Sequence, residues 1–260
     1  MQVATGARFM AGPDLSKRIV YRVDGMSDAR VQRDVVYKRD AGVELQMNIS
    51  APASLSGDAR APAVFFVHGG PIASDMTPPA QWGVFVSYGE LAAASGLVGV
   101  TFNHRLFALT DYERAQSDVA AAIDYVRSHA AELNVDADRI ALWYFSGGGP
   151  LMAPMLRDLP DYVRCILAFY AYLQPAATHV RSKGTGLPIF IARAGLDSPR
   201  INETIDQFVQ EALAGNAVLD VMNHAAGQHG FDIRDDNDRS REIIARAVAF
   251  AQTHVRKSAR

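Results

Sequence analysis

Short apolar runs alternate with helical segments over most of the chain. Residues 63–67, with the sequence AVFFV, form a continuous apolar run of the kind found in strands buried on both faces. Residues 112–133 place apolar side chains at spacings of three and four, which is typical of an amphipathic helix. The apolar runs cover residues 63–67, 97–102, 139–145, 163–170, 187–195 and 217–223, and the helical segments cover about 80–95, 112–133, 151–159, 201–214 and 238–255. This alternation predicts an α/β fold with a doubly wound, mostly parallel sheet and helices on both faces.

Two further runs, at residues 34–39 and 43–49, come before this pattern and alternate partially between apolar and polar residues. The turn sequence Asp40-Ala41-Gly42 separates them, so we expect an antiparallel N-terminal hairpin at one edge of the sheet. Residues 1–32 show weak periodicity and are expected to form an N-terminal arm that could act as a small cap. Residues 33–260 are then one domain without internal repeats. The connector from Tyr170 to Leu187 is short, so any lid is expected to be minimal or absent.

The helix expected at residues 201–214 has candidate signals at both ends. Asn202 is a suitable residue to cap its first turn, and Gly215 is a suitable residue to stop it.

Composition excludes several classes of function. Hydrophobic residues make up 49% and charged residues 21% of the 260 residues, and the formal net charge is −2, so no basic footprint for nucleic acid is present. The single cysteine, Cys165, cannot form an intramolecular disulfide and lies in an apolar run, where we expect a buried, inert thiol. No apolar stretch reaches the roughly 18 residues of a membrane helix, and no signal-peptide pattern occurs. We therefore expect a cytoplasmic enzyme or binding protein without membrane insertion.

Reactive residues follow the expected strands at the points where those strands end. Residues 63–67 lead into His68-Gly69-Gly70, and residues 139–145 lead into Ser146. Asp197 follows the run 187–195, and His229 lies in a glycine-flanked loop after the last strand. In an open α/β sheet, functional groups gather beyond the carboxyl ends of the strands. A serine, an aspartate and a histidine are therefore expected to meet at one edge.

The sequence around Ser146 favours a sharp strand-to-helix turn. A serine that presents its hydroxyl above a sheet occupies a strained backbone conformation, which requires small neighbours. Three glycines and Pro150 follow Ser146 directly, and a second apolar run begins after them. Tyr144 departs from the Gly-x-Ser-x-Gly pattern of such turns because it occupies the first glycine position. We expect Tyr144 either to widen the local packing or to turn its ring away, and the crowding is tolerable if the neighbouring strand offers a small residue there.

The segments FVHGGP, FSGGG, RAGLDSP and GQHGFD occur in this order at the strand ends. On the basis of these four segments, the chain resembles the α/β-hydrolase fold over about residues 33–255, in particular its esterase/lipase and dienelactone-hydrolase-like branches. The resemblance implies a catalytic domain in which Ser146 is the nucleophile, His229 the base and Asp197 the acid that orients the base. It also implies an oxyanion hole formed by the N–H groups of Gly69, Gly70 and Gly147, to which Pro71 cannot contribute.

Several residues near these segments have competing interpretations. His224 lies closer to the last strand than His229 does, and Asp232 is a weaker candidate for the acid because it follows the histidine. His68 is expected to brace its loop, and Arg105 is expected to order loops through hydrogen bonds. Four aromatic residues could line an acyl or alcohol pocket, although core packing explains most aromatic side chains: Trp82, Phe107, Tyr170 and Tyr172.

These observations predict a serine carboxylic-ester hydrolase that acts on short-acyl, soluble esters through an acyl-enzyme intermediate. The partner is then a small-molecule ester, and a homodimer is compatible with the sequence. No cofactor is expected, and no metal is expected because the histidines are dispersed without ligand spacing. A sugar-ester deacetylase remains an alternative, as does a non-catalytic ligand-binding or receptor protein on a hydrolase scaffold, which Tyr144 alone supports. A prolyl-oligopeptidase-like enzyme would need a large gating domain, and a dienelactone-type lactonase would carry cysteine at position 146.

Overall fold

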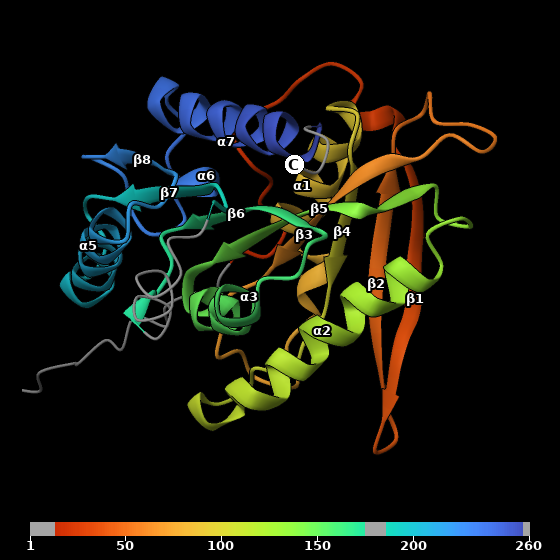
Figure 1. Cartoon of the computed structure of the whole chain (residues 1–260), viewed down its shortest axis with the longest axis horizontal. Coiled ribbons are helices and arrows are strands. Elements are labelled where there is room, and N and C mark those ends of the chain that lie inside the picture. Colours follow the sequence, from red (N-terminus) through yellow and green to blue (C-terminus); the bar gives the residue numbers. More distant parts are fainter. Residues whose placement is uncertain (1–13, 175–185, 257–260) are drawn as a thin grey trace, which may run out of the picture.

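The computed structural model describes residues 14–174 and 186–256, in which one twisted sheet is covered by helices on both faces (Figure 1). The eight described strands lie in the order β1-β2-β4-β3-β5-β6-β7-β8. The pairs β1–β2 and β2–β4 are antiparallel, and the others are parallel. This agrees with the predicted doubly wound sheet and its antiparallel edge. The strands are β1 (Arg30–Asp40), β2 (Val43–Ala51), β3 (Ala61–Val67), β4 (Val98–Phe102), β5 (Val135–Phe145), β6 (Val163–Phe169), β7 (Ile189–Ala194) and β8 (Leu219–His224).

The helices divide between the two faces (Figure 1). Helices α1 and α7 pack on one face, and α2, α3 and α5 pack on the other. The α-helices are α1 (Gly83–Ala94), α2 (Tyr112–Ser128), α3 (Ala153–Asp158), α5 (Pro199–Ala214), α6 (Phe231–Arg234) and α7 (Asp238–Arg256). Short 3-10 helices are η1 (Met26–Asp28), η2 (Pro79–Gln81), η3 (Leu109–Asp111) and η4 (Ser146–Met152).

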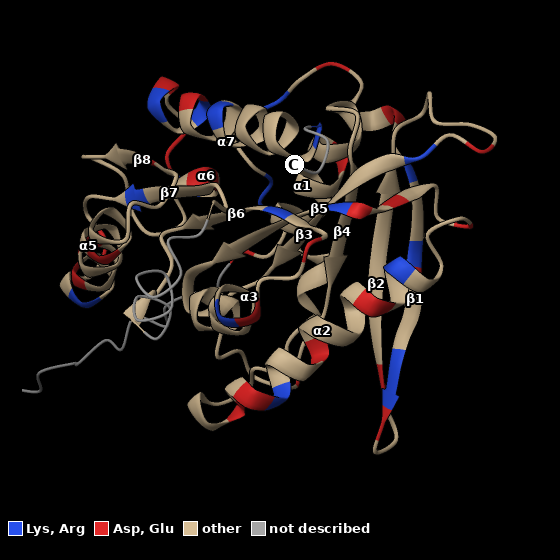
Figure 2. Ribbon diagram, viewed as in Figure 1, with Lys and Arg blue, Asp and Glu red and all other residues tan. Residues whose placement is uncertain are grey.

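Two apolar cores lie between the sheet and its helices because successive strand residues point to opposite faces. In β5, Leu142 and Tyr144 face the core under α2 and α3, whereas Trp143 and Phe145 face the core under α1 and α7. Cys165 is fully buried in the second core, and burial raises the pKa of its thiol. Charged residues of both signs lie on the outer helices and the β1–β2 hairpin (Figure 2). None of the described helices is both long and apolar enough to cross a membrane.

Two helix boundaries differ from those expected from the sequence. The helix expected at residues 201–214 begins at Pro199, and its cap is Ser198, whose hydroxyl accepts the Ile201 N–H. The prediction of Asn202 as the cap is therefore wrong: Pro199 is well suited to the first helical position because it lacks an N–H to satisfy. The helix expected over 112–133 ends at Ser128, after which the chain turns through Asn134 at φ 54° to enter β5.

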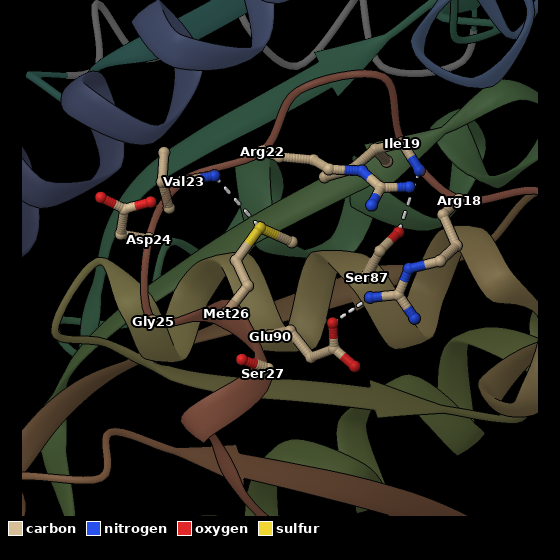
Figure 3. A pocket seen from close by; sticks show the side chains of 10 residues that line it. All are labelled: Arg18, Ile19, Arg22, Val23, Asp24, Gly25, Met26, Ser27, Ser87 and Glu90. Atoms are coloured by element: carbon tan, nitrogen blue, oxygen red, sulfur yellow. Dashed lines mark hydrogen bonds and ion pairs between the residues drawn. The ribbon is translucent and has the colours of Figure 1, made fainter.

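The described part of the N-terminal arm, residues 14–32, packs along α1 (Figure 3). Ile19 is buried in the core under α1 and α7, and its N–H donates to the Ser87 hydroxyl at 3.1 Å. Arg18 forms an ion pair with Glu90 of α1. The arm and α1 together line a cavity of about 520 Å³, and Figure 3 shows its walls.

Candidate active site

Ser146 lies at the turn between β5 and η4. Its φ angle is 51°, a left-handed value that a serine adopts only under local constraint. Its carbonyl oxygen accepts the N–H of Tyr172 at 3.0 Å, which anchors the turn to the segment after β6. The strained conformation agrees with the turn expected from the sequence.

The three glycines after Ser146 each lie against the backbone of another segment. A Cβ on Gly147 would lie 1.8 Å from the carbonyl oxygen of Gly70. A Cβ on Gly148 would lie 2.4 Å from the His68 carbonyl oxygen, and one on Gly149 would lie 2.2 Å from the Tyr172 carbonyl oxygen. No side chain fits at these distances, so the glycine run is a packing requirement of the turn.

Tyr144 is accommodated by its neighbours in the sheet. It is fully buried, and its ring lies in the core under α2 and α3, away from Phe145 and the opposite face. Its partners in the adjacent strands are Val67 on β3 and Ala168 on β6. Ala168 is a small residue on the neighbouring strand, which is the condition under which the crowding is tolerable. The Tyr144 hydroxyl has no hydrogen-bond partner among the described residues, and burial raises its pKa.

The structure brings Ser146, His229 and Asp197 together. The Ser146 Oγ lies 2.8 Å from the His229 Nε2, and the His229 Nδ1 lies 2.6 Å from the Asp197 Oδ2. The Asp197 Oδ1 accepts the N–H of Ser198 at 2.7 Å. The Asp197 side chain is only 4% exposed, whereas that of His229 is 37% exposed and can reach solvent. A carboxylate in this position holds the imidazole with its unprotonated Nε2 toward the hydroxyl.

Backbone hydrogen bonds hold the loops of Asp197 and His229 side by side. The N–H of Gly195 donates to the His224 carbonyl, and the N–H of Leu196 donates to the Gly227 carbonyl, both at 2.8 Å. His224 itself is buried, with its Nε2 3.1 Å from the Ser240 hydroxyl of α7. The structure therefore places His229, and not His224, against Ser146.

Asp232 lies near this group but does not replace Asp197. Its carboxylate is fully buried, with one oxygen accepting the Tyr88 hydroxyl and the other the Tyr170 hydroxyl, each at 2.8 Å. Burial raises the pKa of Asp232, and the two phenol hydrogen bonds oppose that shift. The ring of Tyr170 lies 4.7 Å from the ring of His229, so this buried network borders the site. The sequence reasoning missed Tyr88 because it lies on α1, far from every motif.

The glycine loop after β3 lies directly against the turn of Ser146. A Cβ on Gly69 would lie 2.8 Å from the Ser146 Cβ. The N–H groups of Gly69 and Gly70 make no hydrogen bond with any part of the chain that the structure describes. Donors of this kind remain available to an atom that approaches Ser146.

Two stacked histidines, His68 and His104, support this glycine loop. The rings of His68 and His104 lie 3.5 Å apart and nearly parallel. The His104 N–H donates to the His68 Nε2, so the proton of His68 lies on Nδ1, which donates to the Gly69 carbonyl at 2.6 Å. Burial lowers the pKa of His104 to about 4 and lowers that of His68 as well, so both rings are neutral near pH 7. His68 thus braces its loop, as expected.

Arg105 connects the segment after β4 to two other elements. Its guanidinium pairs with Asp118 of α2 through two hydrogen bonds, at 2.9 and 2.7 Å, and with Asp40 of β1 at 2.7 Å. Burial would raise the pKa of Asp118, but hydrogen bonds from Arg105 and Lys38 outweigh it and hold that pKa below its usual value. The ordering role expected for Arg105 agrees with these contacts.

A cavity of about 360 Å³ opens above Ser146 and His229. Trp82 and Tyr170 line it, as expected, whereas Phe107 and Tyr172 do not. Among the described residues, no group of three or more histidine, cysteine or acidic side chains is arranged to hold a metal ion. The wall of the cavity is largely apolar and includes Ile72, Trp82, Val84, Phe85, Phe145 and Ile233.

Comparisons with known proteins found one family model and many solved structures that are similar to the chain. The BD-FAE family model matches residues 47–158, which include Gly69, Gly70 and Ser146. No curated protein matches the chain. Solved structures of the esterase Est2 from the Planctomycetes species Thermogutta terrifontis are similar over most of the chain.

The native Est2 structure is 25% identical, with a TM-score of 0.70, and the match covers 86% of this chain and 92% of that one. The propionate-bound form is 24% identical, with a TM-score of 0.72 and coverage of 88% and 95%. The form phosphorylated by paraoxon is 24% identical, with a TM-score of 0.69 and coverage of 88% and 93%. The sheet order and these matches together show that the chain has the α/β-hydrolase fold and is similar to solved esterases over most of its length.

Proposed function

We propose that the protein is a carboxylesterase that hydrolyses short-acyl, soluble esters through an acyl-enzyme on Ser146. The observation that carries this proposal is the hydrogen-bonded series from Ser146 Oγ through His229 to Asp197, with distances of 2.8 and 2.6 Å. Serine alone is a weak nucleophile and requires an adjacent base that a third group orients. In this series His229 is the proposed base, and Asp197 is the proposed group that orients it.

In the proposed reaction, His229 Nε2 takes the hydroxyl proton as Ser146 Oγ attacks the ester carbonyl carbon. Asp197 stabilises the imidazolium that forms. Negative charge then develops on the carbonyl oxygen, and the N–H groups of Gly69, Gly70 and Gly147 are the proposed donors to it. The imidazolium protonates the leaving alcohol as the acyl-enzyme forms. Water attacks that intermediate with His229 as base, which releases the acid and restores Ser146.

The size and lining of the cavity support a short acyl group. About 360 Å³ is near the lower end of ordinary ligand pockets, and the apolar wall suits a small alkyl chain. Residues 14–32 of the arm do not line this cavity. Solved forms of the similar esterase Est2 hold propionate and butyrate.

A fluorophosphonate probe tests the nucleophile. We expect the wild type to be labelled, Ser146→Ala to be unlabelled and the surface variant Ser128→Ala to be labelled like the wild type, as read by intact-protein mass spectrometry. An unlabelled wild type would contradict the proposal and favour the binding-protein alternative.

The same preparations test the acyl preference with p-nitrophenyl acetate, butyrate and palmitate. We expect kcat/KM for acetate and butyrate to exceed that for palmitate at least tenfold, because the cavity does not hold a long chain. The opposite ranking would contradict the short-acyl assignment. Acetylated sugars in the same panel test the deacetylase alternative.

A further inference from the structure

Arg234 stands out in the cavity above Ser146. Among the described residues that line this cavity, it is the only lysine or arginine, and the surrounding wall is largely apolar. It ends α6, the short helix that begins just after His229 and Gly230. A fixed positive charge therefore lies at the rim of an otherwise apolar site.

The backbone of α6 directs Arg234 back toward the triad histidine. The Arg234 N–H donates to the Gly230 carbonyl at 3.0 Å, and the Arg234 Cδ lies 3.8 Å from where a Cβ on Gly230 would be. The stem thus covers Gly230, the residue next to His229. Burial and the charge of Asp232 raise the pKa of the Tyr170 phenol, and the charge of Arg234 opposes this, so the guanidinium lies close enough to act on that side chain.

Acidic residues close to Arg234 in the sequence, and Asp197 of the site, have other partners, and among them Asp236 pairs with Arg241. Asp235 accepts the N–H and the side-chain amide of Gln228, at 2.7 and 2.8 Å. Asp232 faces inward to Tyr88 and Tyr170, and Asp197 faces His229 and Ser198. Arg234 itself is exposed and forms no ion pair with any residue in the described ranges 14–174 and 186–256. Its charge is available to a ligand in the cavity.

We propose that the preferred substrates are esters that also carry a free carboxylate, which Arg234 binds at the rim while the ester carbonyl lies at Ser146. The planar guanidinium suits a carboxylate because two parallel N–H groups match its two oxygens. The apolar wall accepts the methylene chain between the carboxylate and the ester. The inference rests on the proposed ester hydrolysis and names the substrate class of that site.

Matched pairs of esters test the proposal, with acid release followed in a pH-stat. Monoethyl adipate carries the carboxylate on the acyl side, and 4-acetoxybutanoate carries it on the alcohol side. For each, the reference is the primary amide that replaces the carboxylate with an uncharged group of similar size. We expect the wild type to favour the carboxylate of at least one pair by about 3- to 10-fold in kcat/KM, and we expect high salt to reduce this ratio.

Three variants locate the effect. Arg234→Gln should bring the carboxylate-to-amide ratio close to one, and Arg234→Lys should restore part of it because the charge returns without the planar geometry. Arg22→Gln removes the same charge from an exposed arginine at the separate cavity of the arm (Figure 3) and should leave the ratio as in the wild type.

Two results would overturn the inference: a wild-type ratio near one for both pairs, or a ratio that Arg234→Gln leaves unchanged. Different results would show that the proposed ester hydrolysis at Ser146 is itself wrong. In that case Ser146→Ala would hydrolyse the amide esters as fast as the wild type does, or the wild type would hydrolyse none of the esters.

Discussion

Asp232 holds a fully buried carboxylate that forms no ion pair within the described residues. Two phenols, from Tyr88 on α1 and Tyr170 after β6, donate the hydrogen bonds that stabilise it. Buried charges are costly unless they are hydrogen-bonded, so each phenol contributes substantially to stability. The ring of Tyr170 also lies beside the ring of His229.

Tyr170→Phe tests this contribution at the residue scale. The substitution keeps the ring but removes one donor to Asp232, and we expect the free energy of unfolding to fall by about 1–3 kcal/mol. Tyr172→Phe is the matched control because its hydroxyl donates to the exposed Gln174 side chain, and we expect a change within about 0.5 kcal/mol. Urea denaturation of both variants gives the comparison, and equal losses would contradict the role of the Asp232 network.

At the scale of elements, the ion-pair group of Arg105 joins three parts of the fold. Asp118 lies on α2, Asp40 and Lys38 lie on β1, and Arg105 follows β4. The segment 103–106 that carries Arg105 also carries His104, which stacks on His68 beneath the glycine loop. The edge hairpin and α2 are thus connected to the loop that faces Ser146.

Asp118→Asn tests this connection. The variant removes one partner of a buried pair and leaves the Arg105 charge partly uncompensated, so we expect a loss of about 3 kcal/mol in the free energy of unfolding. Glu44→Gln is the matched control, since Glu44 pairs with Arg39 on the exposed hairpin and should change stability by less than about 1 kcal/mol. Losses of the same size in both variants would show that the Arg105 group has no special role.

At the scale of the whole molecule, the buried histidines make stability depend on pH. The pKa of His104 is about 4 in the folded protein because burial disfavours its charged form, against 6.5 as the ordinary value. The unfolded chain therefore binds more protons than the folded chain between these values. The contribution of neutral His104 is complete above pH 6.5 and is lost as the pH falls toward 4.

We expect His104 alone to cost about 2 kcal/mol of stability between pH 7 and pH 5. Urea denaturation across this range gives the slope for the wild type, and His104→Gln should have a shallower slope because it lacks the titrating ring. His129→Gln is the control: this partly buried histidine lies at the end of α2, away from the site, and its variant should keep the wild-type slope. If His104→Gln keeps that slope too, the pH dependence arises elsewhere.

The parts of the site that follow directly from a strand end could be predicted from the sequence. Ser146 and Asp197 follow the buried strands β5 and β7, and His229 follows the edge strand β8. Parallel strands deliver their carboxyl ends to one edge of the sheet. The three glycines after Ser146 were also informative, because their close approaches exclude every side chain. The pairing of Tyr88 with Asp232 could not be predicted, since 144 residues separate them and Tyr88 belongs to no local pattern.

The sequence by itself determined the fold class, the antiparallel edge and the order of the strand-end residues. The period of the apolar residues and the small residues at a tight turn can both be read from short stretches of sequence. Only the tertiary structure decided that α5 begins at Pro199, that Ala168 makes room for Tyr144 and that His224 turns to Ser240 while His229 meets Ser146. It also left the Arg234 guanidinium beside the apolar cavity with no ion pair to any of residues 14–174 and 186–256. These outcomes depend on which side chains from distant segments become neighbours, and that is fixed only when the sheet and its helices pack together.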